Sequence, residues 1–252
     1  MERQNILDLL GARSGIVAFV GAGGKKTTIY RLADLHPGRV GVTTTVRITE
    51  FPADFEAERV IGEVADLAVG VPRAAGNSQR VAYALPPEQP GRLDGTPPEL
   101  VRRLHGEGGF DATFVKADGA RMRWVKCPRP GEPVLPSGTT TLVPIVSARG
   151  FGRPLDDRIA HRPERCAELL GMAAGETLRP EQLAGLLGPY MACRENREDL
   201  TVVPLINMVD DADLEEAART AARAVLDRYP FVPRVVLGRM RSAEPLRAVV
   251  TR

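Results

Sequence analysis

A glycine-rich turn near the N-terminus is the stretch of this sequence best suited to binding phosphate. It reads Gly-Ala-Gly-Gly-Lys-Lys-Thr-Thr over residues 21–28 and follows directly on the apolar run 16–20. Glycine permits positive φ and close approach of the backbone, so N–H groups can converge on phosphate oxygens beside the start of a helix. The residues that we predict to contact phosphate are Gly21, Ala22, Gly23, Gly24, Lys25, Lys26, Thr27 and Thr28.

The turn departs from the standard phosphate-binding pattern G-x-x-x-x-G-K-[ST] in both possible alignments. With Lys25 as the phosphate lysine, Phe19 replaces the first glycine and Lys26 replaces the hydroxyl residue; with Lys26 in that role, Lys25 replaces the last glycine. Two alternatives therefore stay open. One is a dinucleotide-binding G-x-G-x-x-G turn, although Lys26 replaces its third glycine and threonines stand where a ribose-binding acid is expected. The other is a strand-to-helix turn without a ligand, but adjacent lysines at a helix start oppose its dipole and favour a bound anion.

Two further apolar runs end in residues whose oxygens suit Mg²⁺. Thr43 begins a row of three threonines at the end of one run, and Asp118 follows another. Hydroxyl and carboxylate oxygens bind Mg²⁺ at nucleotide sites. We predict a Mg²⁺ site formed by Thr27, Thr43 and Asp118, and we predict Lys25 and Asp118 as catalytic residues. Because threonine favours strands and Asp-Gly favours turns, a structural role for Thr43 and Asp118 stays open.

A late apolar run ends in Asn-Met-Val-Asp over residues 207–210. Guanine-nucleotide proteins read the base with N-K-x-D at such a place, and here Met208 replaces the lysine. We predict that Asn207 and Asp210 contact the base. The structural alternative is that Asp210 or Asp211 caps the next helix.

The order of apolar patterns predicts an α/β fold of the P-loop NTPase-like type, a mainly parallel sheet with helices on both faces. The predicted strands cover residues 16–20, 39–43, 80–85, 112–117, 140–146, 200–209 and 233–237. The predicted helices cover residues 27–35, 98–105, 163–171, 180–187 and 213–229. We predict one domain over residues 1–252, with an irregular insert rich in proline and glycine at about 71–99. In such sheets, ligands bind outside the carboxyl ends of the strands.

Composition narrows the class of protein. The 34 basic and 32 acidic residues give a net charge of +2, which offers no reason to expect nucleic acid or an anionic membrane as partner. The N-terminus does not read as a signal peptide, and no apolar run approaches the length of a membrane span. Three widely spaced cysteines without a C-x-x-C pair fit a reducing compartment. We expect a cytoplasmic protein that binds neither nucleic acid nor membrane.

Taken in order, these blocks resemble the YqeC family. The resemblance covers nearly the whole chain and rests on residues 19–25, 43–45, 117–120, 126, 128, 132–133, 152–155, 161–164 and 207–210. Within it, Lys25 matches the family lysine of G-A-G-G-K-T, whereas Lys26 replaces a threonine, Lys116 replaces the glutamate of E-A-D-G, and Met208 departs from N-K-x-D.

The resemblance implies a nucleotide-binding accessory protein in the maturation of a selenium-dependent molybdenum hydroxylase. It implies a P-loop NTPase that uses ATP or GTP with Mg²⁺, and a molybdenum hydroxylase or its cofactor-maturation proteins as partners. Two alternatives stay open: a small-molecule kinase whose loop 119–136 holds the acceptor, and a non-catalytic module that regulates a partner through the nucleotide.

Overall fold

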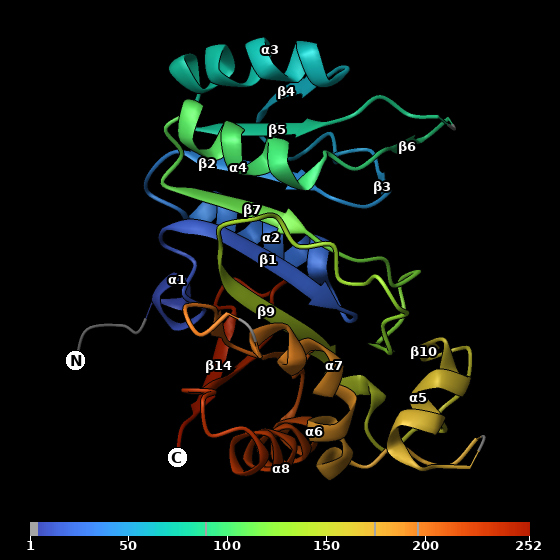
Figure 1. The fold of residues 1–252 in the computed structure, drawn as a ribbon. Helices are drawn as coiled ribbons and strands as arrows, with labels where there is room; N and C mark the ends of the chain where they lie inside the picture. The colour runs from blue at the N-terminus through green and yellow to red at the C-terminus, as the bar shows by residue number, and fades with distance from the viewer. Residues whose placement is uncertain (1–4, 89, 174, 196) are drawn as a thin grey trace. The chain divides into compact units, whose positions relative to one another are not determined.

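The chain forms two compact units in the computed structural model, which describes residues 5–88, 90–173, 175–195 and 197–252 (Figure 1). The first unit comprises Met1–Phe19, Thr28–Gly119 and Gly131–Thr141. The second comprises Val20–Thr27, Ala120–Pro130 and Leu142–Arg252. The prediction of a single domain over residues 1–252 stays a prediction.

The first unit is built on parallel strands in the order β1-β7-β2-β5-β4. Their bounds are β1 (Gly15–Gly21), β2 (Val40–Thr44), β4 (Glu58–Ile61), β5 (Arg80–Ala84) and β7 (Ala112–Lys116). The central strands β2 and β7 are buried along their whole length. This burial on both faces explains why they read as continuous apolar runs in the sequence.

Helices cover both faces of these strands. Figure 1 shows α4 (Pro98–Glu107) in front of them and α2 (Lys25–Leu35) behind. Val115 of β7 packs with Val101 of α4, whereas the next side chain, Phe114, contacts the ring of His36 beyond the end of α2. Adjacent residues of the strand therefore face opposite layers, as a strand buried on both sides requires. The remaining short elements of this unit are α1 (Ile6–Leu9), β3 (Ile48–Thr49) and β6 (Arg92–Leu93).

The helix α3 (Val64–Asn77) corrects the prediction of an irregular insert from about residue 71. That prediction was wrong for residues 71–77, which form the last part of the helix. Pro72 lies inside it. Proline removes one helical hydrogen bond, and tertiary packing outweighs this cost here. The buried residues of the helix have helical spacing and pack with β5 and α4; they are Leu67, Val71, Ala74 and Ala75.

Replacing Leu67 by alanine is expected to lower the free energy of unfolding by about 2–5 kcal/mol, because the fully buried side chain leaves a cavity. Val69 of the same helix is 72% exposed and serves as the matched control. Val69→Ala is expected to change the free energy by no more than about 0.5 kcal/mol. Urea unfolding of both variants tests the assignment, and equal losses would show that α3 does not pack as described.

The second unit contains the parallel strands β9 (Thr139–Ser147), β12 (Leu205–Asn207) and β13 (Val235–Gly238) in the order β9-β12-β13. An antiparallel strand, β14 (Leu246–Val250), pairs with β13 and was not predicted. The predicted strand over 200–209 is interrupted at Pro204, which separates β11 (Thr201–Val202) from β12. The protein thus has the predicted α/β fold of mostly parallel strands, consistent with a P-loop NTPase-like arrangement.

The smaller elements of the second unit lie between these strands in sequence. They are β8 (Val125–Lys126), η1 (Ala148–Gly150), β10 (Ala160–His161), α5 (Pro163–Leu170), η2 (Pro180–Gln182), α6 (Leu183–Leu186), α7 (Gly188–Met191) and η3 (Ala192–Arg194). In the described part of the chain, every helix is too short or too polar to cross a membrane.

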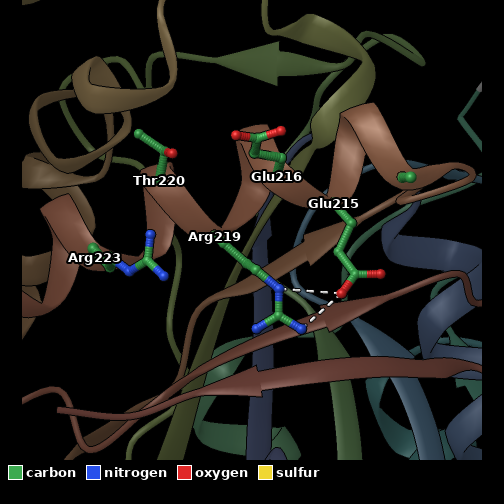
Figure 2. Close-up of a pocket in the computed structure, with 6 residues that line it drawn as sticks. Glu215, Glu216, Arg219, Thr220 and Arg223 are labelled. Carbon is green, nitrogen blue, oxygen red and sulfur yellow. Dashed lines mark hydrogen bonds and ion pairs between the residues drawn. The ribbon is translucent and has the colours of Figure 1, made fainter.

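The helix α8 (Ala212–Arg228) has one buried and one charged face. Its buried face carries Ala218, Ala221, Ala222, Val225 and Leu226. Figure 2 shows a depression along the other face, where Arg219 binds Glu215 one turn away at 2.7 Å beside Glu216, Thr220 and Arg223. Because this pair has the i,i+4 spacing of a solvated helix face, a structural role accounts for it.

Candidate functional site

The glycine-rich turn joins β1 to α2, as predicted, and its backbone requires glycine. Gly21, Gly23 and Gly24 have φ angles of 84°, 95° and 110°. A Cβ atom added to Gly23 would lie 2.5 Å from the backbone nitrogen of Ser147, and one added to Gly21 would overlap the carbonyl oxygen of Ile145. The end of β9 therefore packs against the turn so closely that side chains are excluded.

Part of the turn is held by hydrogen bonds within the chain. The N–H of Ala22 donates to the carbonyl of Ile145 at 2.8 Å, and the N–H of Gly23 donates to the carbonyl of Arg123 at 3.0 Å. The predicted contacts of Ala22 and Gly23 with phosphate stay a prediction, whereas a phosphate at the start of α2 would not compete with these two hydrogen bonds. A helix start is suited to this, because its first N–H groups point out of the helix.

Two lysines stand at the first positions of α2. The ammonium of Lys25 donates to the carbonyl of Gly21, and the residue is only 5% exposed. Lys26 is half-buried, and its burial lowers its pKa below the ordinary value. Both cations lie at the positive end of the helix dipole, an unfavourable position that a bound anion would offset.

Asn207, at the end of β12, connects the turn to the segment after β13. Its amide nitrogen donates to the carbonyl of Gly23 at 2.8 Å, and its amide oxygen accepts from the N–H of Met240 at 3.1 Å. The residue is 2% exposed, so both ends of the amide are engaged inside the protein. The structure thus brings Asn207 to the glycine-rich turn; its predicted contact with a base stays a prediction.

Replacing Asn207 by alanine is expected to cost about 1–3 kcal/mol of stability, because it leaves the Gly23 carbonyl and the Met240 N–H buried without their partner. Asn77 is the matched control, since its amide donates to a backbone carbonyl at 3.2 Å but is exposed. Asn77→Ala is expected to change the stability by less than about 0.5 kcal/mol. Chemical denaturation of the two variants measures both losses of stability. A loss in Asn77→Ala as large as in Asn207→Ala would contradict the role of the Asn207 amide in joining Gly23 to Met240.

A pocket of about 100 Å³ lies beside Asn207. Its lining consists of Thr27, Arg149, Asn207, Met208, Asp210, Arg239, Met240 and Arg241. Three of these residues are arginines and one is an aspartate, Asp210, which binds Arg149 with both contacts at 2.6 Å. The structural alternative, a cap of the next helix by Asp210 or Asp211, is confirmed for Asp211, which accepts from the N–H of Leu214 and caps α8.

Sequence reasoning missed the arginines of this pocket, although a signal for two of them was present. Arg149 lies two residues beyond β9, and Arg239 directly follows β13. Both therefore stand just after the carboxyl ends of parallel strands, where ligands bind in α/β sheets. The rule that located Asn207 and Asp210 locates these two residues as well.

Met208 occupies the place of the lysine in N-K-x-D and has an unusual backbone. Its φ is +60°, and its sulfur accepts a hydrogen bond from the hydroxyl of Ser147 at 3.1 Å. A non-glycine residue in this region is strained by about 1–3 kcal/mol, and such strain is concentrated at functional sites.

The other predicted residues belong to the first unit. The carboxyl ends of β2 and β7 are adjacent, since Thr44 pairs with Lys116 and Asp118 follows two residues later. Thr43 donates its hydroxyl proton to the carbonyl of Tyr83 at 2.7 Å, while Asp118 is fully buried. Thr28 is also fully buried within α2.

The predicted Mg²⁺ site of Thr27, Thr43 and Asp118 combines residues of both units and stays a prediction. Among the residues that the structure describes, there is no group of three or more His, Cys, Asp or Glu side chains that could hold a metal ion. A magnesium ion at a nucleotide needs fewer protein ligands than that, because phosphates and water complete its shell.

The comparisons with known proteins agree with the resemblance seen in the sequence. The family model described as YqeC protein matches residues 17–164, more than half of the chain. A relative named "Uncharacterized protein YqeC", from Escherichia coli (strain K12), is 25% identical over 188 residues, which cover 71% of this chain and 70% of the relative. The chain belongs to the YqeC family.

Proposed function

We propose that the chain binds a nucleoside triphosphate, ATP or GTP, with its phosphates at the turn 21–27 and the start of α2. The observation that carries this proposal is Lys25, a lysine that is 5% exposed at the first position of α2. An ammonium group at the N-terminal end of a helix adds its charge to the positive end of the helix dipole, and both attract a phosphate anion. The positive φ angles of Gly21, Gly23 and Gly24 support the proposal, because they shape the backbone of the turn.

The pocket beside Asn207 supports a place for the base. Its volume of about 100 Å³ is below the several hundred Å³ of pockets that enclose whole ligands. The pocket therefore suits one flat group such as a base. Arginine planes stack on bases, and Met208 and Met240 offer apolar surface. In this proposal, Asp210 reads the base after Arg149 turns from it toward the ligand.

Asp118 is the residue that best fits a magnesium ion. It is fully buried directly beyond β7, and a carboxylate oxygen is a ligand that Mg²⁺ prefers. The hydroxyl proton of Thr43 is committed to Tyr83, so Thr43 would contribute through a remaining lone pair on its oxygen. When bound, Mg²⁺ would neutralise charge on the phosphates, while Lys25 and the helix start position them.

Turnover assays distinguish hydrolysis from the other two functions. The purified chain is incubated with ATP or GTP and Mg²⁺, and inorganic phosphate is measured without any acceptor. Slow phosphate release is expected, and it should disappear in Asp118→Asn. Release that requires a small-molecule acceptor would favour a kinase, and tight binding with no turnover would favour a regulatory module.

We further propose that the nucleotide serves the maturation of a selenium-dependent molybdenum hydroxylase, the role that the family resemblance implies. Deleting the gene is expected to lower the activity of that hydroxylase in its native host, and the Lys25→Met variant should fail to restore it. Unchanged hydroxylase activity in the deletion strain would contradict this role but leave nucleotide binding intact.

A further inference from the structure

The outward face of α3 is unusually poor in charge for a helix at the surface. Its fourteen residues contain two charged side chains, Asp66 and Arg73, whereas the seventeen residues of α8 contain seven. Six large apolar side chains are exposed in the described part of the chain, and three of them lie close together in sequence: Ile61, Val64 and Val69. Exposed apolar side chains gathered in one place, with few charges among them, are typical of a surface that another protein covers.

Helical geometry divides this face into an apolar edge and a charged edge. Because an α-helix has 3.6 residues per turn, positions 65, 69, 72 and 76 fall on the side of α3 opposite its buried residues. They form the apolar edge, which consists of Ala65, Val69, Pro72 and Gly76. Asp66 and Arg73 are seven residues apart and lie along the other edge, and both are exposed.

The two charges make this face complementary to itself. When two copies of α3 meet face to face and antiparallel, a two-fold axis between positions 69 and 70 sets Asp66 of each copy opposite Arg73 of its partner copy. The two apolar edges then meet as well. A parallel pair would instead set each charge against the apolar edge of the other helix. In a two-fold dimer, residue i contacts residue j and j contacts i, which is the relation that these two charges have.

The surroundings of α3 favour such a contact. The neighbouring strand β4 is the last strand of the sheet, and Figure 1 shows α3 at that end of the first unit. The small residues Ala65 and Gly76 allow a second helix to approach closely, since the side chains at a contact set the distance between helix axes. Asp66 accepts from the N–H of Glu63 through Oδ2 at 3.0 Å, which orients its carboxylate at the surface.

We propose that this face of α3 is the interface of a two-fold homodimer, with the two helices antiparallel and Asp66 paired with Arg73 in both directions. One helix face from each chain makes a small interface, so the expected dissociation constant is about 10–100 µM. The dimer does not depend on the proposed nucleotide site, because α3 lies within the Thr28–Gly119 part of the first unit.

Sedimentation velocity of the full chain without nucleotide tests the proposal over concentrations from about 1 to about 300 µM. The mass is expected to be that of one chain at the lowest concentration and to approach twice that mass at the highest. Urea unfolding of Leu67→Ala and Val69→Ala at low micromolar concentration therefore compares monomers.

Substitutions on the face should weaken the dimer. Val69→Arg sets a charge at its centre and should raise the dissociation constant at least about 10-fold. Arg73→Asp should raise it about 10-fold, because the two-fold axis replaces two ion pairs by two pairs of like charge. Leu169→Arg is the matched control, since Leu169 is 40% exposed on α5, and it should leave the constant unchanged.

Two further variants test the register of the helices. Asp66→Arg combined with Arg73→Asp exchanges the charges and should restore the dissociation constant to within about threefold of the natural value. In a separate experiment, Asp66→Cys chains are mixed with Arg73→Cys chains and oxidised mildly. A disulfide should join position 66 of one chain to position 73 of the other. Neither variant alone should link its altered positions, which lie about 10 Å apart along the antiparallel helices.

Two results would overturn the proposal. In the first, the natural chain keeps the mass of one chain up to about 300 µM, well above the expected dissociation constant. In the second, a dimer forms that Val69→Arg and Arg73→Asp leave unchanged, which would place the contact elsewhere on the molecule. Because the sites of these two substitutions are exposed, folding is expected to be retained. No nucleotide is used, so failure of the dimer leaves the proposed function untouched.

Discussion

Gly21→Ala is expected to lower the free energy of unfolding by about 2–5 kcal/mol, one of the largest effects expected of a single methyl group in this protein. The φ of Gly21 is 84°, a conformation that costs alanine about 1–2 kcal/mol. The added Cβ would overlap the carbonyl oxygen of Ile145, so β9 or the turn must shift as well. Equilibrium denaturation of the purified variant measures the loss.

Gly76→Ala is the matched control, because Gly76 is helical and a Cβ added there meets nothing within 4 Å. This substitution is expected to leave stability unchanged or raise it by about 0.5–1 kcal/mol, since alanine favours the helix. If both glycines tolerate alanine equally, the close approach of β9 to the turn is wrong.

Lys25→Met is expected to weaken nucleoside triphosphate binding by about 10- to 100-fold, the loss of a charge-assisted hydrogen bond or two. Methionine keeps the length and the apolar stem of the buried side chain but removes its charge. The effect should therefore fall on binding rather than on folding. Isothermal titration calorimetry with the Mg²⁺ complexes of ATP and GTP measures the dissociation constants.

Arg223→Met provides the control for the loss of one positive charge, because Arg223 belongs to the charged face of α8 shown in Figure 2. Its affinity for nucleotide should equal that of the natural chain. Lys26→Met tests which lysine of the turn binds phosphate. It should lose less affinity for nucleotide than Lys25→Met, because Lys25 is the residue that matches the family lysine. Equal affinities for the natural chain and Lys25→Met would remove the phosphate role from Lys25.

The sequence predicted the central strands well for a physical reason. Strands buried on both faces must be apolar throughout, so the runs that became β1, β2 and β7 stand out without any knowledge of their neighbours. The helix α3 was missed because Pro72 and two glycines dominate its local propensity, whereas the packing of Leu67 and Val71 that stabilises it is long-range. The strand β14 was missed because its side chains are mostly half-exposed and include Arg247, so no clear apolar pattern marks it.

For the candidate site, the sequence predicted positions better than interactions. The ends of parallel strands located Asn207 and Asp210, and the same reasoning extends to Arg149 and Arg239. It could not reveal that Asn207 clamps Gly23 to Met240, or that Arg149 binds Asp210, because these contacts depend on side-chain directions set by the fold. The threonine row illustrates the same limit, since Thr43 holds the carbonyl of Tyr83 on the neighbouring strand.

The most direct test of nucleotide binding is the melting temperature of the full chain with and without ATP or GTP in the presence of Mg²⁺. At a nucleotide concentration about 100-fold above the dissociation constant, binding adds about 2.7 kcal/mol and should raise the melting temperature by roughly 5–10 °C. The rise should saturate with concentration and be largely absent in Lys25→Met. If neither nucleotide changes the melting temperature at millimolar concentration, the chain does not bind a nucleoside triphosphate at this turn.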